Sequence, residues 1–445
     1  MTSYKAHLKE TIKLAIPVAI GQLGHIMLGI TDSIMVGQVG AVPLAASSLV
    51  NGIAFLIIVF GLGMTLAITP LVSIARGRGE DDQCGVILRQ SLLVNTVVII
   101  VLLGIILFLA DMIVYMNQED AVAVQATSYA KIIAFSIIPF ILFQVYRQFI
   151  EGLAFTKPAM YITLAANLVN VFGNWVFIYG NLGMPAYGLD GAGYATLITR
   201  SFMAATLVIY VLSAKRYKQY EPTFRFRNIN WHVIKELIRV GVPTGFQHFF
   251  EVGAFSFSAI MIGWLGSTQL AAHQIALSLA SVSFMIILGI SAAGTIRVGH
   301  AYGRKNINDV RRSGFLTTFF AAAVMACFGV AFVIFRDRLP FIFSDDPAVI
   351  KIAASLIIVA ALFQMSDGAQ AAGLGILRGI TDVRLPMIIT FIAYWIIALP
   401  IGYILGFTFK LEVIGIWIGL SAGLTAAAIM LNWRFWIKTG KIEFN

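Results

Sequence analysis

The feature that most constrains this chain is a succession of apolar stretches, each long enough to cross a bilayer as a helix. A bilayer core about 30 Å thick needs roughly 20 mostly apolar residues per helix. Hydrophobic residues make up 59% of the 445 residues and charged residues only 12%. The sequence therefore predicts an all-α polytopic membrane protein, because a helix satisfies its own backbone hydrogen bonds in lipid.

Twelve such stretches can be counted, and we expect twelve transmembrane helices. Their approximate limits are 11–37, 44–70, 90–111, 129–150, 160–182, 188–213, 237–263, 270–296, 314–336, 349–372, 384–408 and 414–437. The first stretch is too long to be the apolar core of a cleavable signal peptide. The two cysteines, Cys84 and Cys327, indicate neither a disulfide framework nor a thiolate metal site.

The distribution of basic residues predicts the orientation. With the amino terminus inside, 25 of the 31 Lys and Arg residues fall in inner loops and tails. The others are Lys131, Arg336, Arg338, Lys351 and Lys410 in outer loops, and Arg200 within a span. By the positive-inside rule we expect a multi-pass membrane protein with both termini in the cytoplasm. The net charge of +10 therefore reports orientation, and we expect no nucleic-acid partner.

The two halves of the chain repeat. A shift of 226 residues aligns many glycines and prolines without a gap over the first spans of each half, and a shift of 227 continues the match further along. The pairs include Pro17 with Pro243, Gly37 with Gly263, and Gly152 with Gly379. Six spans per copy is an even number, so both copies enter the membrane from the same side. We therefore expect two six-helix bundles related by a pseudo-two-fold axis along the membrane normal, an arrangement typical of transporters.

This repeat predicts the domain organisation. An N-lobe would comprise 1–213, a cytoplasmic linker 214–236, and a C-lobe 237–445. We expect a cleft between the lobes, membrane lipids around them, and a monomer.

Three acids lie deep inside apolar spans: Asp32, Glu251 and Asp367. A charge at the bilayer centre costs about 2.5–3.5 kcal/mol on insertion scales, so it is mostly retained where it has a function. Under the repeat, Asp32 aligns with Ser258 and Glu251 aligns with His25. The scaffold repeats but the acids do not, which favours two different chemical sites on one duplicated frame.

Other polar residues share helix faces with these acids. Asn170 and Asn174 form a stripe in the fifth span, and Thr196 lies one turn from Arg200 in the sixth. As candidates for lining a substrate cleft we take Gln22, His25, His248, Gln274, Phe363 and Gln364. Structural explanations stay open at this point: Asp32 could pair with Arg200, the asparagines could join helices, and the histidines could be ordinary hydrogen-bonding groups.

These landmarks resemble the multidrug and toxic compound extrusion (MATE) family, and within it the NorM-type branch. The motifs are "TDSIMVGQVG", "FFEVGAFSFSAIMIGWLG" and "QMSDGAQAAGLGILRGITDVRLPM", each with its acid, together with "IEGLAFTKPAM" and "NLVNVFGNWVFIYG". The resemblance covers nearly the whole chain. It implies a secondary-active exporter of small, amphipathic organic cations, driven by inward flow of Na⁺ or H⁺, with no other cofactor and no enzymatic activity.

The resemblance also implies roles for particular residues. The C-lobe cation site maps onto Glu251 and Asp367, which are the candidate Na⁺ ligands, and the N-lobe acid maps onto Asp32. Asn170, Asn174 and Thr196 would form the polar shell of Asp32. NorM-type proteins can carry a tyrosine one turn before the acid of span 10, where this chain has Phe363. The loss of that hydroxyl predicts a poorer Na⁺ site and favours proton coupling.

Three rival functions follow from the same pattern. A flippase or exporter of lipid-linked or other amphipathic substrates could share a two-bundle fold, but for anionic headgroups it should carry several basic residues at membrane depth. An intramembrane enzyme would need a motif such as HExxH or GxSxG in its proper context. The sequence has no HExxH, and its one GxSxG run, at 419–423, lies inside the apolar stretch 414–437 rather than at a strand-to-helix turn. A channel would not need two different acid sites within a duplicated frame.

Overall fold

The computed structural model describes residues 4–116, 118–221 and 229–442, and over these residues it contains helices and no strand. The α-helices are α1 (Tyr4–Gly37), α2 (Ala41–Thr65), α3 (Ile68–Arg78), α4 (Asp81–Met112), α5 (Asp120–Gly152), α6 (Lys157–Phe177), α7 (Leu189–Ser213), α8 (Trp231–Gly263), α9 (Ser267–Gly303), α10 (Ile307–Phe335), α11 (Pro347–Gly379), α12 (Arg384–Phe391), α13 (Leu399–Tyr403) and α14 (Glu412–Gly440). Short 3₁₀ turns are η1 (Ile113–Tyr115), η2 (Lys215–Tyr220) and η3 (Leu339–Ile342), and wider π-helical turns are η4 (Ile392–Ala398) and η5 (Ile404–Thr408). The predicted all-helical membrane fold is confirmed.

The helices reproduce the predicted spans and extend beyond most of them. Within the described residues, 11 helical segments are long and apolar enough to cross a membrane. Two are composite, because α2 and α3 form Ala41–Arg78 and α12 to η5 form Arg384–Thr408. The remaining predicted span corresponds to α8, which is 33 residues long. Its apolar character is interrupted by Gln247, His248 and Glu251, so the least apolar span is one that carries a candidate site.

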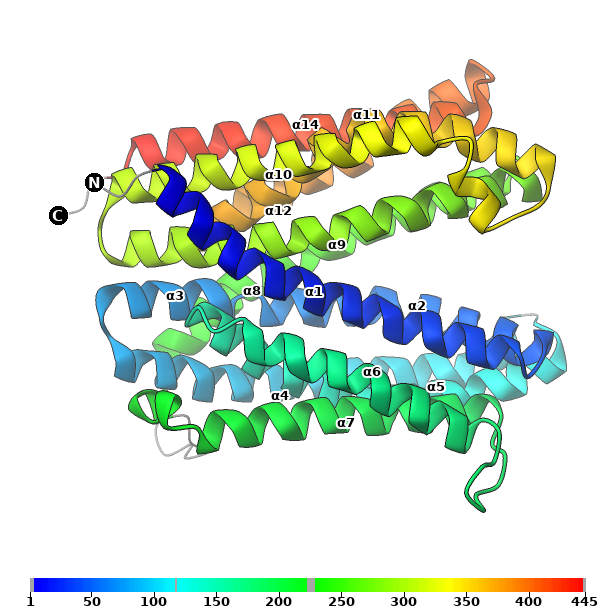
Figure 1. Cartoon of the computed structure of the whole chain (residues 1–445), viewed down its shortest axis with the longest axis horizontal. Helices are drawn as coiled ribbons and strands as arrows, with labels where there is room; N and C mark the ends of the chain where they lie inside the picture. The colour runs from blue at the N-terminus through cyan, green and yellow to red at the C-terminus, as the bar shows by residue number, and fades with distance from the viewer. Residues whose placement is uncertain (1–3, 117, 222–228, 443–445) are drawn as a thin grey trace. The chain divides into compact units, whose positions relative to one another are not determined.

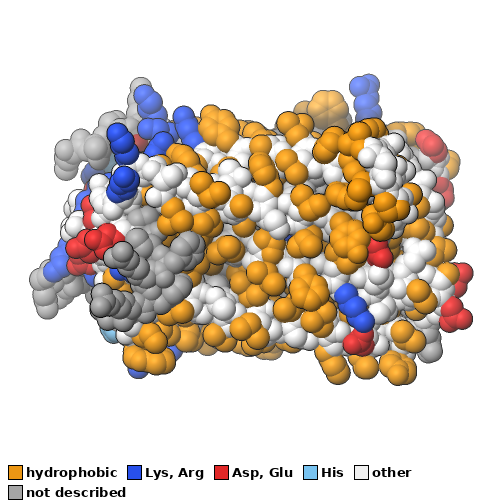
Figure 2. Space-filling view, turned by 90° about the horizontal axis from the view of Figure 1, so that it is seen from below, with side chains coloured by type: hydrophobic (Ala, Val, Ile, Leu, Met, Phe, Trp, Pro, Cys, Tyr) orange, Lys and Arg blue, Asp and Glu red, His pale blue; other side chains and the backbone are white. Residues whose placement is uncertain are grey.

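The outer surface of α4 shows why these helices need lipid. Val97, Ile100 and Phe108 are 62%, 63% and 64% exposed, and their spacing places them on one face of the helix. On the face drawn in Figure 2, hydrophobic side chains cover the middle, and most charged side chains lie toward the two ends. Such a band suits the hydrocarbon core, with charges at the level of water and headgroups.

The chain forms two compact units. The N unit is Ile20–Gly245, and the C unit consists of the described residues of Met1–Ala19 and Phe246–Asn445. Helices α1 and α8 therefore each contribute to both units. Each boundary lies two residues after a proline inside the helix, Pro17 in α1 and Pro243 in α8, where a backbone hydrogen bond is missing. The predicted lobes at 1–213 and 237–445 remain a prediction.

Each unit is organised around one long helix. In the N unit α5 packs against α2, α4 and α7, and in the C unit α11 packs against α9, α10 and α14 (Figure 1). Helices α5 and α11 occupy equivalent places in the sequence repeat. Each carries buried polar residues among the surrounding helices, such as Arg147 and Glu151 in α5 and Gln364 and Asp367 in α11.

Close packing in the C unit depends on small residues. Gly415 and Gly419 of α14 face Gly406 and Gly402, respectively, in the composite segment Arg384–Thr408. On both sides the two glycines are four residues apart. A Cβ atom added to Gly419 would lie 2.4 Å from the Cα of Gly402. In lipid, where apolar surface gains little from burial between helices, such backbone approach is a main source of helix association.

We expect Gly419→Ala to destabilise the protein by about 1–3 kcal/mol, because the added methyl must push two backbones apart. The matched control is Gly104→Ala in α4, where a Cβ meets nothing within 4 Å and better helix propensity stabilises by up to about 1 kcal/mol. The measurement is the temperature at which half of the detergent-solubilised protein stops eluting as a monodisperse peak. A Gly419→Ala protein as heat-resistant as the wild type would contradict the packing argument.

Candidate functional site

In the N unit, two helices, α6 and α7, bring side chains to Asp32 of α1. Its Oδ1 accepts hydrogen bonds from Nδ2 of Asn174, at 2.6 Å, and of Asn170, at 3.0 Å, both from α6. Its Oδ2 accepts one from the Thr196 hydroxyl of α7 at 3.0 Å. The asparagines are buried and Asp32 is half-buried. The structure thus assembles all four residues that the sequence analysis assigned to this site.

The charge of Asp32 is balanced by neutral donors and not by an ion pair. Arg200, the basic residue considered as its partner, donates instead to Ser136 Oγ at 2.7 Å. Its guanidinium carbon also lies 4.7 Å from the centre of the Phe140 ring. Over the described residues Asp32 therefore has no salt bridge, and a cation or proton can reach it without first displacing an arginine.

Two cleft candidates on the same helix make other contacts. His25 lies edge-on to Phe140 and Phe143, with ring centres 6.2 and 6.0 Å away. Its Nε2 is buried and has no hydrogen-bond partner among the described residues. Gln22 accepts a long 3.5 Å hydrogen bond from Arg147 through its Oε1.

In the C unit, Glu251 of α8 is the centre of a second polar cluster. Its Oε1 accepts hydrogen bonds from the Tyr394 hydroxyl of η4, at 3.2 Å, and from Gln370 Nε2 of α11, at 3.3 Å. Its Oε2 lies 3.9 Å from His248 Nδ1. Asp367, one turn before Gln370, is near enough to interact electrostatically with Glu251, and each acid is 8% exposed. Two buried carboxylates so arranged repel each other unless a proton or cation compensates them.

The oxygen atoms around Glu251 suit a monovalent cation. Besides the two carboxylates, Tyr394 brings a hydroxyl, and the buried Oε1 of Gln370 has no hydrogen-bond partner among the described residues. A free amide oxygen beside two acids is a donor set that hard cations accept. The described residues contain no cluster of three or more His, Cys, Asp or Glu able to hold a metal ion, so such a site uses mixed ligands.

Tyr394 is the residue beside Glu251 that sequence analysis missed. Phe363 was expected beside the acids, where its lack of a hydroxyl would leave the cation site one oxygen ligand short. Instead, Phe363 is 4% exposed and packs on Trp417, with ring centres 5.7 Å apart. A tyrosine from another helix supplies the hydroxyl instead. The sequence repeat did indicate a polar position here, because a shift of 227 residues aligns Tyr394 with Asn167 of the N unit.

The wider turn of η4 helps to place Tyr394. The neighbouring Trp395 also reaches α8, where its Nε1 donates to the Phe250 carbonyl at 3.0 Å. In a regular α-helix, consecutive side chains point about 100° apart, and a π-helical turn reduces that angle. Two adjacent residues can therefore both contact α8.

The other cleft candidates of the C unit have different surroundings. Gln364 is fully buried and donates through Nε2 to Ser283 Oγ at 2.9 Å. Gln274 of α9 is exposed. His248 is half-buried beside Glu251, and its Nε2 has no partner among the described residues. Of the candidates in this unit, only His248 therefore joins the acids.

The repeat aligns the acid cluster of the C unit with residues of the N unit other than Asp32 and its donors. His25 with Phe140 and Phe143 in the N unit aligns with Glu251, Asp367 and Gln370 in the C unit, by shifts of 226 and 227. The same three positions hold an apolar contact in one unit and an acid cluster in the other. The conserved frame therefore positions the side chains, and the substitutions decide which unit carries two acids.

Comparisons with known proteins follow this duplication. The MatE family model matches residues 17–176 and again 243–404, so its two matches begin 226 residues apart. "Multidrug resistance protein NorM" of Vibrio vulnificus (strain YJ016) is 35% identical over 454 aligned positions, which cover 100% of this chain and 99% of that protein. "Probable multidrug resistance protein NorM" of Mesorhizobium japonicum is 36% identical over 447, covering 99% and 95%. The crystal structure of a eukaryotic MATE transporter, AtDTX14, has the same fold, with a TM-score of 0.89, 98% of each chain covered and 19% identity.

A buried ion pair in α5 differs from the two acid sites, because its acid already has a partner. Arg147 Nε donates to Glu151 Oε1 at 2.7 Å, and the two side chains are 4% and 3% exposed. Removing one partner from such a pair leaves an uncompensated buried charge, which costs about 3–5 kcal/mol. We expect Arg147→Met to lower stability by that amount, and Arg147→Met with Glu151→Leu to restore most of it.

The comparison is made by thermal stability in detergent. Arg434→Met serves as control, since its 2.8 Å pair with Asp382 is partly exposed and should contribute about 1 kcal/mol or less. If Arg147→Met and Arg434→Met were equally mild, the Arg147 pair would not be a structural element of α5.

Proposed function

Because the chain belongs to the MatE family, we propose that it is a multidrug efflux antiporter that exports organic cations in exchange for Na⁺ or H⁺ by alternating access. Relatives that match it over nearly its whole length are named multidrug resistance proteins, and the chain is a transporter rather than an enzyme. We further propose a monomer in the bacterial inner membrane, with both termini in the cytoplasm and lipid around its apolar band.

The observation that carries the proposal is the state of the acids. Asp32, Glu251 and Asp367 lie on helices long and apolar enough for the membrane, or on α8, and none forms a salt bridge with Lys or Arg over the described residues. In contrast, Glu151 is paired with Arg147 at 2.7 Å. Uncompensated carboxylates at this depth are costly to retain, and this favours reversible occupation by a cation.

The proposed cycle follows from charge balance. When the acids are empty, their negative field attracts a cationic, aromatic substrate, and neighbouring aromatic rings add cation–π contacts. When a proton or Na⁺ occupies them, the field falls and the substrate leaves. A membrane potential contributes about 2.3 kcal/mol per charge per 100 mV, which corresponds to near 50-fold accumulation for each net charge moved.

The oxygen set of the C unit keeps both coupling ions in the proposal. The argument against Na⁺ was the missing hydroxyl at Phe363, and Tyr394 supplies a hydroxyl at 3.2 Å from Glu251. The proposed C-unit Na⁺ site therefore consists of Glu251 and Asp367, with Tyr394 and Gln370 as neutral ligands. The proposed N-unit site is Asp32, with its three neutral donors.

The flippase alternative makes a different demand. A pathway for anionic headgroups should present several basic side chains without partners, as Arg–phosphate recognition requires. Arg147 is paired with Glu151, Arg200 with Ser136 and Phe140, and Arg297 with His7 and Thr11. These contacts favour structural roles for these three arginines, and the acids at the two sites favour organic cations as substrates.

We expect Glu251→Gln and Asp367→Asn to abolish gradient-driven efflux while leaving insertion and folding intact, because each removes a charge that links the two fluxes. Asp32→Asn should reduce efflux similarly, since its three donors remain but the charge is lost. Ethidium efflux from energised cells measures the effect. The matched control is Ser258→Ala, the repeat counterpart of Asp32, whose hydroxyl only bonds the Ala254 carbonyl of its own helix and which should pump normally. Normal pumping by both acid variants of the C unit would refute the proposal.

Imposed gradients identify the coupling ion. In proteoliposomes loaded with ethidium, we expect transport to follow an inward gradient of Na⁺, of H⁺, or of both, because either ion can neutralise the same carboxylates. A pH gradient and a Na⁺ gradient are applied separately, with the membrane potential clamped by K⁺ and valinomycin. Transport that ignores both gradients, but occurs down the ethidium gradient alone, would identify a channel instead.

A further inference from the structure

Buried polar atoms without partners gather on one side of Glu251 in the C unit. They are Gln247 Nε2 and His248 Nε2 of α8, and Gln370 Oε1 and Arg378 Nε of α11, none of which has a hydrogen-bond partner among the described residues. Gln247 and His248 precede Glu251 on α8, whereas Gln370 and Arg378 follow Asp367 on α11. A buried polar group without a partner costs about 1–3 kcal/mol, so several together indicate space occupied by water.

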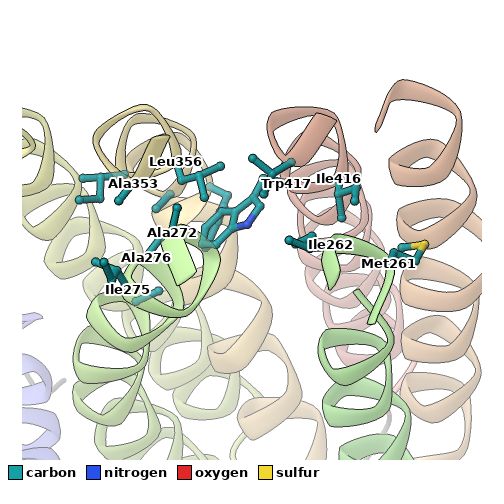
Figure 3. Packing of buried hydrophobic residues seen from close by; sticks show 14 of the residues in the cluster. Met261, Ile262, Ala272, Ile275, Ala276, Ala353, Leu356, Ile416 and Trp417 are labelled. Carbon is teal, nitrogen blue, oxygen red and sulfur yellow. The ribbon is translucent and has the colours of Figure 1, made fainter. Parts of the chain in front are cut away.

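The other side of Glu251 is mostly apolar, although His273 of α9 accepts a hydrogen bond from Trp417 Nε1 there at 3.0 Å and its buried Nε2 has no hydrogen-bond partner among the described residues. The buried cluster there includes Ala254 on α8 and Leu356, Ala360 and Phe363 on α11, with Trp417 of α14. Figure 3 shows Leu356 and Trp417 among apolar side chains of α9 and α14. More of the unpartnered buried polar atoms near Glu251 and Asp367 therefore lie on the side that leads toward the carboxyl end of α11. The orientation proposed above places that end at the cytoplasm.

Arg378 lies on this side of Glu251, in the last turn of α11. It follows Asp367 by eleven positions on α11, which is about three turns, so the two residues share one face of the helix. Helical side chains lean toward the amino end of their helix, and this brings the guanidinium back toward the acids. Arg378 is 8% exposed and interacts electrostatically with Glu251 and His248, but it forms no ion pair over the described residues.

We propose that a hydrated route leads from Glu251 to the carboxyl end of α11, and that Arg378 lowers the affinity of the Glu251–Asp367 site so that the coupling cation leaves along it. The proposal rests on the proposed function, because it concerns the ion that drives export. A site that bound its cation too tightly would not release it, and the fixed positive charge of Arg378 opposes binding without occupying the carboxylates.

The titratable and charged groups around Glu251 come from three elements. They are His248 from α8, Asp367 and Arg378 from α11, and Tyr394 from η4. Of these, Arg378 is positively charged at neutral pH. Its effect on bound Na⁺ and on bound protons should therefore have the same sign.

The first experiment measures ion affinity in the purified full-length protein. Binding of radioactive Na⁺ is followed at fixed pH, and proton binding is followed with an indicator dye in Na⁺-free buffer. We expect Arg378→Met to bind whichever ion the wild type binds roughly tenfold more tightly, and to turn over more slowly in efflux. Arg378→Lys, which keeps the charge, should resemble the wild type. Arg384→Gln, which removes an exposed charge at the start of α12, should also be unchanged.

Affinity in Arg378→Met that is equal to or weaker than in the wild type would overturn the proposal. Glu251→Gln, tested beside it, separates this failure from failure of the proposed function. If Glu251→Gln still binds the ion and pumps, the antiport proposal itself is wrong. If Glu251→Gln is inactive while Arg378→Met is unaffected, only the role of Arg378 is wrong.

The second experiment tests the water route without relying on transport. In a protein with both native cysteines replaced by serine, Gln247→Cys and Ala360→Cys are compared, because each native residue is 1% exposed. We expect a small, membrane-impermeant cationic thiosulfonate to label Gln247→Cys at least about tenfold faster than Ala360→Cys, and from the cytoplasmic side only. Equal labelling of the two cysteines, or labelling of Gln247→Cys from the outside, would show that the route does not exist.

Discussion

The structure depends on the cost of keeping carboxylates at membrane depth without basic partners. Where this chain only needs stability, it pairs the acid, as Arg147 does with Glu151 in α5. Around Asp32 and Glu251 it uses neutral amides and hydroxyls instead. Neutral donors hold a carboxylate in place but leave its charge available. A passing cation would therefore gain from binding there, as the proposed coupling of two fluxes requires.

Gene-level duplication gave the two units a common frame but not common chemistry. The positions of His25, Phe140 and Phe143 in the N unit correspond to those of Glu251, Asp367 and Gln370 in the C unit. Several glycines at close helix approaches are shared, such as Gly152 and Gly379, whereas the polar side chains differ. The N unit therefore has a single acid with three donors, and the C unit has an acid pair. A single acid and an acid pair hold cations with different strengths, so one frame can support two different sites.

Much of this could be predicted from the sequence because it depends on local properties. Hydropathy over about 20 residues located each span, and helical spacing placed Asp32, Glu251 and Asp367 on polar faces. Predictions that needed the register between helices were less successful. Phe363 was expected beside the acid, yet it packs on Trp417. The hydroxyl of Tyr394 comes from a helix whose π-helical turn has no simple sequence pattern. Arg378 was counted among loop charges, although α11 extends through it and buries it.

The sequence by itself determined the class of fold, the number of apolar segments, the duplication and the depth of the acids, because each depends on residue type and spacing along one helix. Only the tertiary structure decided which side chains meet across helices and which side of Glu251 is polar. The reason is that helix register is set by close backbone approach at many small residues together, as between Gly402 and Gly419. A shift of one residue there would rotate Tyr394 by about 100° and take its hydroxyl away from Glu251.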